Sequence, residues 1–515
     1  MNRTLVGQLS HFAESLAGHV AISDTLGNEL TYCNLWNTAS EIARRMDEFR
    51  GKIDFAFVMA NRGPLQAVAI LAALISRTPL ALLDIRQGSS RIATMLNQGE
   101  RVVGIVDTIG EGFLGKIDSL EGLSSVTDYL KVDIGRLDIE AIEFPSAVGS
   151  RDDVRTGSCI PSGTALIIYT SGSSGVPKGV CIGGSDLDAR AWVEKDWFGL
   201  QEGDSVLGVL PVNFDVGLTQ LLGTLISGGQ YIFSNSWFPS EILAQISARK
   251  PCGIAMSPMV WKGLLRIRDK DELWAGINRL RYVTLSGGTL PCEDLREIVE
   301  NVKNTSFIKT YGQTEMFRIA SCKVGSNPAD LTSVGAVYPG VEISIVNDLG
   351  EPLSIGVEGN IVAAGLGRMI GYVGGESLNP EDTVNTGDLG YMDSTGRLFV
   401  SGRKSEMIKI MDQRVFPQDV ASSIKAVLNV SDVVVLASSG EDPILSAVVE
   451  LGGKESLDES TCYSVLRQRL ASHMVPKKIY FIREIPTTIS GKVDVPALKD
   501  FMRIQDEVRK SQKTH

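Results

Sequence analysis

The residues best suited to chemistry lie at positions 170–179, which read TSGSSGVPKG. Glycines let backbone N–H groups approach a polyphosphate closely, hydroxyls add further donors, and Lys178 adds a positive charge. The residues expected to hold phosphates are Thr170, Ser171, Gly172, Ser173, Ser174, Gly175 and Lys178. The apolar run 165–169 before the loop is typical of a buried strand. Taken alone, the same composition also fits a Ser/Gly-rich surface linker.

Other catalytic constellations are scarce in this sequence. A Walker A loop, GxxxxGK(S/T), does not occur. Four histidines are present, at positions 11, 19, 473 and 515. A Ser-His-Asp hydrolase and a His-ligated metal enzyme are therefore disfavoured, and the chemistry must depend on other side chains.

The elements that must position the loop alternate between strand-like and helical patterns. The apolar run 55–59 is followed by helical spacing over 65–75. Such alternation predicts α/β layers with largely parallel sheets. From Val341 the pattern changes to short β segments and turns, and a compact α+β pattern follows. We therefore predict a large N-terminal domain of layered α/β sheets with a β-rich subdomain, and a small α+β C-terminal domain, over residues 1–402 and 403–515.

Composition narrows the class of protein further. At 515 residues the chain is too long for one hydrophobic core. Its net charge of −11 disfavours a nucleic-acid backbone or an anionic membrane as the main partner. The longest apolar stretch, 67–75, is too short to span a bilayer, and the N-terminus lacks a signal-peptide pattern. Seven scattered cysteines indicate free thiols. We expect a soluble cytoplasmic protein that binds neither nucleic acid nor membrane.

The loop at 170–179 resembles, at every position, the phosphate loop S/T-S-G-S/T-S/T-G-x-P-K-G of the acyl-adenylate-forming (ANL) superfamily. That superfamily comprises acyl-CoA synthetases, peptide-synthetase adenylation domains and luciferases. Further motifs follow in the family's order, so the resemblance extends from Leu30 to Lys492. It implies ATP-dependent activation of a carboxylic acid as acyl-AMP, release of pyrophosphate, and transfer of the acyl group to an acceptor.

Two motifs extend the expected ATP site. Residues 309–315, KTYGQTE, resemble the family's YGxTE motif. The resemblance implies that Tyr311 packs on adenine, that Thr314 binds the α-phosphate, and that Glu315 binds Mg²⁺, which prefers few carboxylates plus substrate phosphates. On its own, this Thr-Glu pair would more often be a helix N-cap. Residues 285–291, LSGGTLP, resemble the adenine-contacting loop, which adds Gly287, Gly288 and Thr289.

Three motifs nearer the C-terminus complete the expected site. By resemblance, Asp388 accepts hydrogen bonds from the ribose hydroxyls, and Arg403 contacts ribose or phosphate. Residues 486–492, PTTISGK, resemble the family's P-x-x-x-S/N-G-K loop and imply that Lys492 is catalytic. An ammonium held between the attacking carboxylate and the α-phosphate favours the reaction by positioning and electrostatics. Outside this family context, Asp388 would be a turn aspartate and Lys492 an exposed lysine.

The acyl pocket is expected to begin at the segment 210–221. Phe214 and Asp215 resemble the F-D-x-S of amino-acid-activating members, whose aspartate binds the substrate ammonium, but Gly217 replaces the serine. Amino acids and other acids stay equally open as substrates. The lining residues carried over by resemblance are Asp215, Val216, Thr219, Ala255, Thr284, Ser286 and Thr310.

The acceptor depends on two departures from the family pattern. Ser405 occupies the hinge position, which is usually Asp or Lys, and Asp412 replaces a glycine in the next loop. In the family, rotation of the mobile C-terminal domain brings that loop to the active site, beside the pantetheine arm. Aspartate adds bulk and charge where glycine permits close approach, unless it merely caps the hairpin. Transfer to a thiol of CoA or a carrier protein, and transfer to an amino-acid amine as in coronafacate ligases, both stay open.

The sequence also bears on two other classes of protein. A non-catalytic adenylate-binding protein would not need Lys492, whereas this chain has it. A kinase or ATPase would carry motifs that this sequence lacks. Release of pyrophosphate, as opposed to ADP, separates these classes.

Overall fold

The structure of the chain is a computed structural model. It describes residues 4–121, 123, 125–143, 159–171, 176–325, 327–379, 381–405, 408–410, 413–438, 444–451, 457–470, 474–487 and 493–512. The chain divides into two compact units. The first comprises Met1–Ile343, Val362–Thr386 and Gly396–Leu398, and the second comprises Ser344–Ile361, Gly387–Thr395 and Phe399–His515.

One sheet of the first unit carries the strands that border the predicted phosphate loop. Its strand order is β19-β9-β8-β4-β3-β5-β6-β7. The bounds are β3 Phe55–Ala60, β4 Leu80–Asp84, β5 Val102–Val106, β6 Val126–Asp133, β7 Asp138–Glu143, β8 Thr164–Ser171, β9 Pro177–Gly183 and β19 Met369–Tyr372. Strands β3, β4, β5, β6 and β8 run parallel, and β7, β9 and β19 pair antiparallel to their neighbours.

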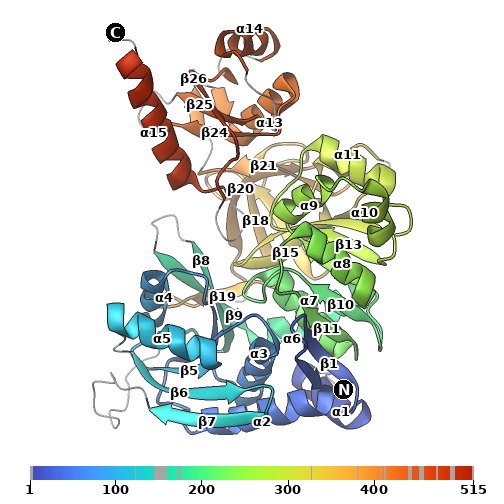
Figure 1. The fold of residues 1–515 in the computed structure, drawn as a ribbon, viewed down its shortest axis with the longest axis vertical. Coiled ribbons are helices and arrows are strands. Elements are labelled where there is room, and N and C mark those ends of the chain that lie inside the picture. Colours follow the sequence, from blue (N-terminus) through green and yellow to red (C-terminus); the bar gives the residue numbers. More distant parts are fainter. Residues whose placement is uncertain are drawn as a thin grey trace. The chain divides into compact units, whose positions relative to one another are not determined.

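Helices cover both faces of this sheet, which explains why β3 is apolar throughout. Phe57 and Met59 pack with helices α4 and α5, whereas Ala56 and Val58 pack with α2 and α3. Side chains alternate between the faces of a strand, so a strand covered on both sides needs apolar residues at every position. Figure 1 shows these helices around the sheet. Their bounds are α2 Tyr32–Asp47, α3 Pro64–Ser76, α4 Ser89–Leu96 and α5 Thr108–Glu121.

A second sheet of the first unit has the order β16-β15-β14-β13-β12-β10-β11-β1-β2. Strands β10 to β14 and β1 run parallel, so the carboxyl ends of β12, β13 and β14 meet at one edge. Ligands of α/β proteins bind at such edges. The bounds are β1 Val20–Asp24, β2 Glu29–Thr31, β10 Ser205–Gly208, β11 Gln230–Phe233, β12 Gly253–Met256, β13 Tyr282–Leu285, β14 Ser306–Gln313, β15 Met316–Lys323 and β16 Gly335–Val337.

This second sheet is also covered on both faces. One cluster packs α8, α9, α10 and α11 against it, and the main core packs α6 and α7 against its other face (Figure 1). The helices are α1 Leu5–Ser15, α6 Gly184–Trp197, α7 Asp215–Ile226, α8 Pro239–Arg249, α9 Pro258–Leu265, α10 Lys270–Ile277, α11 Cys292–Asn301 and α12 Ala329–Thr332. The predicted layered α/β architecture is confirmed.

The second unit contains the predicted β-rich segment and an α+β fold. The segment holds β17 Val341–Val346, β18 Gly359–Gly365, β20 Val384–Met392 and β21 Arg397–Arg403, with β17 and β20 beginning, and β18 and β21 partly lying, in the first unit. Tyr391 and Phe399 stack with ring centroids 4.9 Å apart. The remaining elements are β22 Ile408–Ile410, β23 Gln413–Val415, α13 Pro417–Leu428, β24 Asp432–Ala437, β25 Leu445–Glu450, α14 Glu459–Arg469, β26 Lys478–Ile482 and α15 Val495–Gln512.

The α+β character predicted for the C-terminal residues is therefore confirmed. Its core combines Val420 and Ile424 of α13 with Val433 and Ala447 of the sheet. The predicted domain boundary between residues 402 and 403, and the predicted mobility of the C-terminal domain, stay predictions. None of the described helices combines the length and the apolarity needed to cross a membrane.

Candidate active site

The predicted phosphate loop is bordered by a pair of strands, β8 and β9. Strands β8 and β9 pair antiparallel, with Thr170 opposite Lys178 and Ser171 opposite Pro177. Lys178 is exposed. The pairing thus places a predicted hydroxyl donor and the predicted cation across from each other. Gly172, Ser173, Ser174 and Gly175 lie outside the described residues.

The predicted Mg²⁺ ligand lies at the tip of a second hairpin. Strands β14 and β15 pair antiparallel, and Thr314 and Glu315 form the turn between them. The Tyr372 hydroxyl donates a hydrogen bond to Oε1 of Glu315 at 3.3 Å, and Nζ of Lys178 lies 5.7 Å from the Tyr372 ring centroid. Burial, and next the charge of Glu315, raise the pKa of Tyr372 to about 12. Lys178 and Glu315 therefore meet around a tyrosine that sequence reasoning missed.

The donor chemistry of this place suits magnesium. Glu315 supplies one carboxylate, and the described residues contain no group of three or more His, Cys, Asp or Glu side chains that could hold a metal by themselves. Magnesium is commonly held by one or two carboxylates together with substrate phosphates and water. A carboxylate beside a predicted phosphate-binding lysine fits that requirement. Glu315 would hold the ion, and Thr314 would bind the α-phosphate.

The predicted adenine-contacting residues lie in a surface turn directly after β13. Gly287, Gly288 and Thr289 are all exposed, and Tyr311 on the neighbouring strand β14 is partly buried. Strands β13 and β14 run parallel, with Leu285 opposite Lys309. The turn follows β13, and Tyr311 lies near the carboxyl end of β14, so both lie toward the same edge of the sheet.

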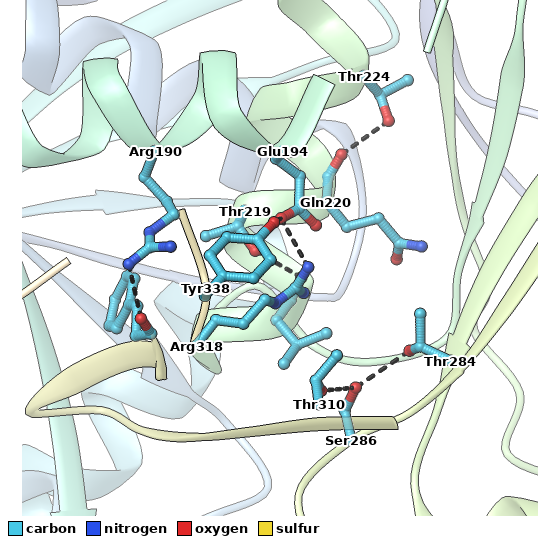
Figure 2. Close-up of polar contacts among 12 residues, drawn as sticks. Arg190, Glu194, Thr219, Gln220, Thr224, Thr284, Ser286, Thr310, Arg318 and Tyr338 are labelled. Atoms are coloured by element: carbon cyan, nitrogen blue, oxygen red, sulfur yellow. Dashed lines mark hydrogen bonds and ion pairs between the residues drawn. The ribbon is translucent and has the colours of Figure 1, made fainter. Parts of the chain in front are cut away.

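A chain of hydroxyls joins three of the predicted pocket residues. Oγ of Ser286 lies 3.0 Å from Oγ1 of Thr284 and 2.7 Å from Oγ1 of Thr310 (Figure 2). Trp261 donates its indole N–H to the carbonyl of Thr284 at 3.2 Å. The three residues come from or follow the adjacent strands β13 and β14. The result is a fixed polar wall, because each hydroxyl is held by another.

The other predicted pocket residues come from α7 and β12. Val216 and Ala255 pack with Leu210 and the partly buried Trp237 in a small apolar cluster. Thr219 lies one turn further along α7 and donates to the carbonyl of Val216 at 3.3 Å. Ala255 stands opposite Thr284 in the parallel pairing of β12 and β13. The pocket predicted from resemblance is thus brought together as an apolar side and a hydroxyl side.

Asp215 begins α7 and is partly buried. Burial raises the pKa of its carboxyl, and the positive charges of Arg318 and Arg190 partly offset that effect. Gly217, the departure noted in this motif, has a steric reason. A Cβ at Gly217 would lie 2.2 Å from the carbonyl oxygen of Pro211, so a serine at this position would not fit.

Behind the pocket lies a buried charged cluster that sequence reasoning missed. Nη1 of Arg318 on β15 lies 2.8 Å from Oε2 of Glu194 on α6, with both side chains at most 3% exposed. The Tyr338 hydroxyl lies 3.4 Å from Oε2 of Glu194, and its ring faces both Arg318 and Arg190 (Figure 2). Burial raises the pKa of Glu194 and lowers that of Arg190 to about 10.

The second unit holds the predicted ribose-binding pair. Nε of Arg403 lies 3.0 Å from Oδ1 of Asp388, which is buried, while Arg403 is exposed. The next residue, Lys404, donates its backbone N–H to the carbonyl of Gly387 at 2.8 Å. The two residues predicted to contact the ribose, Asp388 and Arg403, therefore form an ion pair with each other. Ser405, the predicted hinge, is exposed, and Lys492 and Asp412 lie outside the described residues.

Comparisons with known proteins place this arrangement in a family. The family model described as "AMP-binding enzyme" matches residues 9–373, and "AMP-binding enzyme C-terminal domain" matches residues 419–492. The D-alanine–D-alanyl carrier protein ligase of Bacillus licheniformis is 26% identical over 92% of this chain and 94% of its own. A probable CoA ligase of Humulus lupulus is 26% identical over 91% of this chain and 78% of its own.

Solved structures share the fold. ATP-bound MatB from Rhodopseudomonas palustris superposes with a TM-score of 0.79 at 21% identity, covering 97% of this chain and 99% of its own. The amide bond synthetase McbA from Marinactinospora thermotolerans has a TM-score of 0.78 at 19% identity, covering 97% of this chain and 100% of its own. The fold and site define an ATP-binding, AMP-forming acid ligase. The chain belongs to the AMP-binding enzyme family, whose model spans most of its length.

Proposed function

We propose that this ligase activates an amino acid as its adenylate with MgATP and passes the acyl group to a thiol of coenzyme A or a carrier protein. The observation that carries the proposal is the meeting of Lys178 and Glu315 around Tyr372, since an adenylating site needs a cation and a metal ligand at one triphosphate. The family match and the named activities of the relatives, a carrier protein ligase and a CoA ligase, support it.

The proposed division of work follows the predicted motifs. The loop 170–175 and Lys178 hold the phosphates, Thr314 and Glu315 hold Mg²⁺ with the α-phosphate, and residues 287–289 and Tyr311 hold adenine. Asp388 and Arg403 bind ribose, and Lys492 brings the carboxylate and α-phosphate together. Transfer then follows rotation of residues 403–515 about Ser405. The seven cysteines form no disulfides, which supports a reducing compartment such as the cytoplasm.

The proposed activity is tested by acid-dependent release of pyrophosphate. Purified full-length protein is given ATP, Mg²⁺ and one acid at a time from amino, aryl and alkyl series, and pyrophosphate and ADP are both measured. We expect pyrophosphate with at least one amino acid. ADP as the product would place the protein among kinases or ATPases, and AMP binding without turnover on any acid would make it a non-catalytic binding protein.

Asp215 supports the choice of an amino acid. It is a partly buried carboxylate at the start of α7, next to the pocket residue Val216, and it forms no ion pair with any described residue. An ammonium group on the substrate would supply a direct ion-pair partner. The pKa of Asp215 is raised by burial, and binding a cation would oppose that rise.

Asp215→Asn is expected to lower the preference for an amino acid over its deaminated analogue by about 100-fold. The reason is that only the substrate with the ammonium loses a charge partner. The measurement is kcat/KM for pyrophosphate release with both acids of the pair. The deaminated analogue serves as the control, because kcat/KM for pyrophosphate release with it should change little. A preference for the analogue in the wild-type protein, left unchanged by the substitution, would reassign the substrate to non-amino acids.

The thiol acceptor is tested against an amine. With its best acid, the protein is given coenzyme A, a phosphopantetheinylated carrier protein, or free amino acids, and thioester and amide are both quantified. We expect thioester. If only amide forms, the protein is instead an enzyme that transfers the acyl group directly to an amine. The sequence feature in favour of that activity is Asp412, which replaces the family's glycine.

A further inference from the structure

Strand β19 ties together the two halves of the proposed triphosphate site. At one end, the backbone N–H of Val373 donates to the carbonyl of Gly179, next to Lys178, at 2.8 Å. At the other end, the N–H of Met369 donates to the carbonyl of Glu315 at 2.9 Å. The strand therefore spans from the phosphate-loop strand β9 to the hairpin tip that carries Glu315. Tyr372 is its last residue.

Close packing fixes the strand at the Lys178 end. A Cβ at Gly179 would lie 2.7 Å from Cγ2 of Val373, so a larger residue at Gly179 would push the strand away. Tyr372 itself stands opposite Val180 in the antiparallel register. Because Lys178 and Val180 are two residues apart, their side chains point to the same face of β9. The register therefore places the tyrosine beside the lysine.

The Tyr372 side chain contacts both charged residues, Lys178 and Glu315. Its ring lies 5.7 Å from Nζ of Lys178, within cation–π range, and its hydroxyl donates to Oε1 of Glu315 at 3.3 Å. Within the described part of the chain, neither Lys178 nor Glu315 forms an ion pair. If Lys178 and Glu315 formed a direct ion pair, each would neutralise the other's charge.

We propose that Tyr372 is a positioning residue for MgATP, which aims the Glu315 carboxylate with its hydroxyl and holds the Lys178 ammonium over its ring. The two charges then stay available for the metal and the phosphates. This inference rests on the roles proposed for Lys178 and Glu315. The hydroxyl of Tyr372 would aim Glu315, and its ring would hold Lys178. Substitutions that remove only one of these two parts can test each role separately.

Binding of ATP, measured by calorimetry without any acid, tests the two tasks separately. Tyr372→Phe keeps the ring and should weaken binding of MgATP about tenfold, while binding of ATP in EDTA stays unchanged. Tyr372→Leu should also weaken metal-free binding, about threefold, because Lys178 becomes free to pair with Glu315. Adding Glu315→Gln to Tyr372→Leu should restore the metal-free affinity.

The control is Tyr463→Phe in the second unit, which also loses a tyrosine hydrogen bond, to the carbonyl of Lys477 at 2.8 Å. It should bind MgATP as the wild type does. Wild-type MgATP affinity in Tyr372→Phe would overturn the inference. So would an equal loss with and without metal, which is the mark of a merely structural role. If the wild-type protein binds no ATP, the proposed function fails as well, and that result is distinct from the other two.

Discussion

Lys492→Ala is expected to slow adenylate formation by about 10²–10³-fold, the usual cost of removing one electrostatic contact to a transition state. The attacking carboxylate and the α-phosphate are both anionic, so a lysine between them offsets their repulsion and fixes their approach. The rate is measured by trapping the adenylate with hydroxylamine at saturating ATP and acid. Binding of MgATP, measured without acid, should stay close to that of the wild type.

Two controls separate this role from folding and from acyl transfer. Lys499→Ala, on the exposed side of α15, removes a lysine from the same region and should change nothing. Chemically made acyl-AMP given to Lys492→Ala with the acceptor should react at nearly the wild-type rate, because the substitution affects the first step. Wild-type hydroxamate formation in Lys492→Ala would remove Lys492 from the catalytic site.

Much of this candidate site could be predicted from the sequence, because its motifs are short continuous segments. The two strands that flank the predicted phosphate loop are close together in the chain, and the structure pairs them as β8 and β9. The hairpin that carries Glu315 is likewise one continuous segment, β14 to β15. The layered α/β fold followed from alternating strand and helix patterns, which depend on side-chain periodicity within short windows.

What the sequence could not reveal depends on contacts between distant residues. Tyr372 and Glu315 are 57 positions apart, and they meet because β19 crosses to pair with β9. Arg318 and Glu194 are 124 positions apart. Arg318 comes three residues after Glu315, the last residue of the motif 309–315, and its local sequence indicates only an ordinary strand. Its backbone has a positive φ of 41°, which no local pattern indicates.

Arg318→Met is expected to destabilise the first unit by about 3–5 kcal/mol at pH 8, because it leaves Glu194 buried without its partner. Both side chains are nearly inaccessible, at most 3% exposed, so solvent does not screen the loss. The nearby charges of Arg190 and Asp215 remain in the variant. All six tryptophans lie in the first unit, so tryptophan fluorescence during denaturant unfolding reports on this unit by itself.

The pH dependence identifies the cause of that destabilisation. Burial already raises the pKa of Glu194, and removing Arg318 takes away the largest opposing charge, so the folded-state pKa rises further. When the pKa of an acid is higher in the folded state than in the unfolded state, the folded protein binds more protons than the unfolded chain at pH values between the two. The free energy of unfolding therefore falls as pH rises from the unfolded-state pKa toward the folded-state pKa. Arg318→Met should therefore lose less stability at pH 5.5 than at pH 8. Glu194→Gln combined with Arg318→Met should recover much of the loss and its pH dependence, because no unpaired charge remains between them. A pH-independent loss in the single variant would instead assign the effect to packing against Tyr338 and Phe198, which Arg318 also contacts.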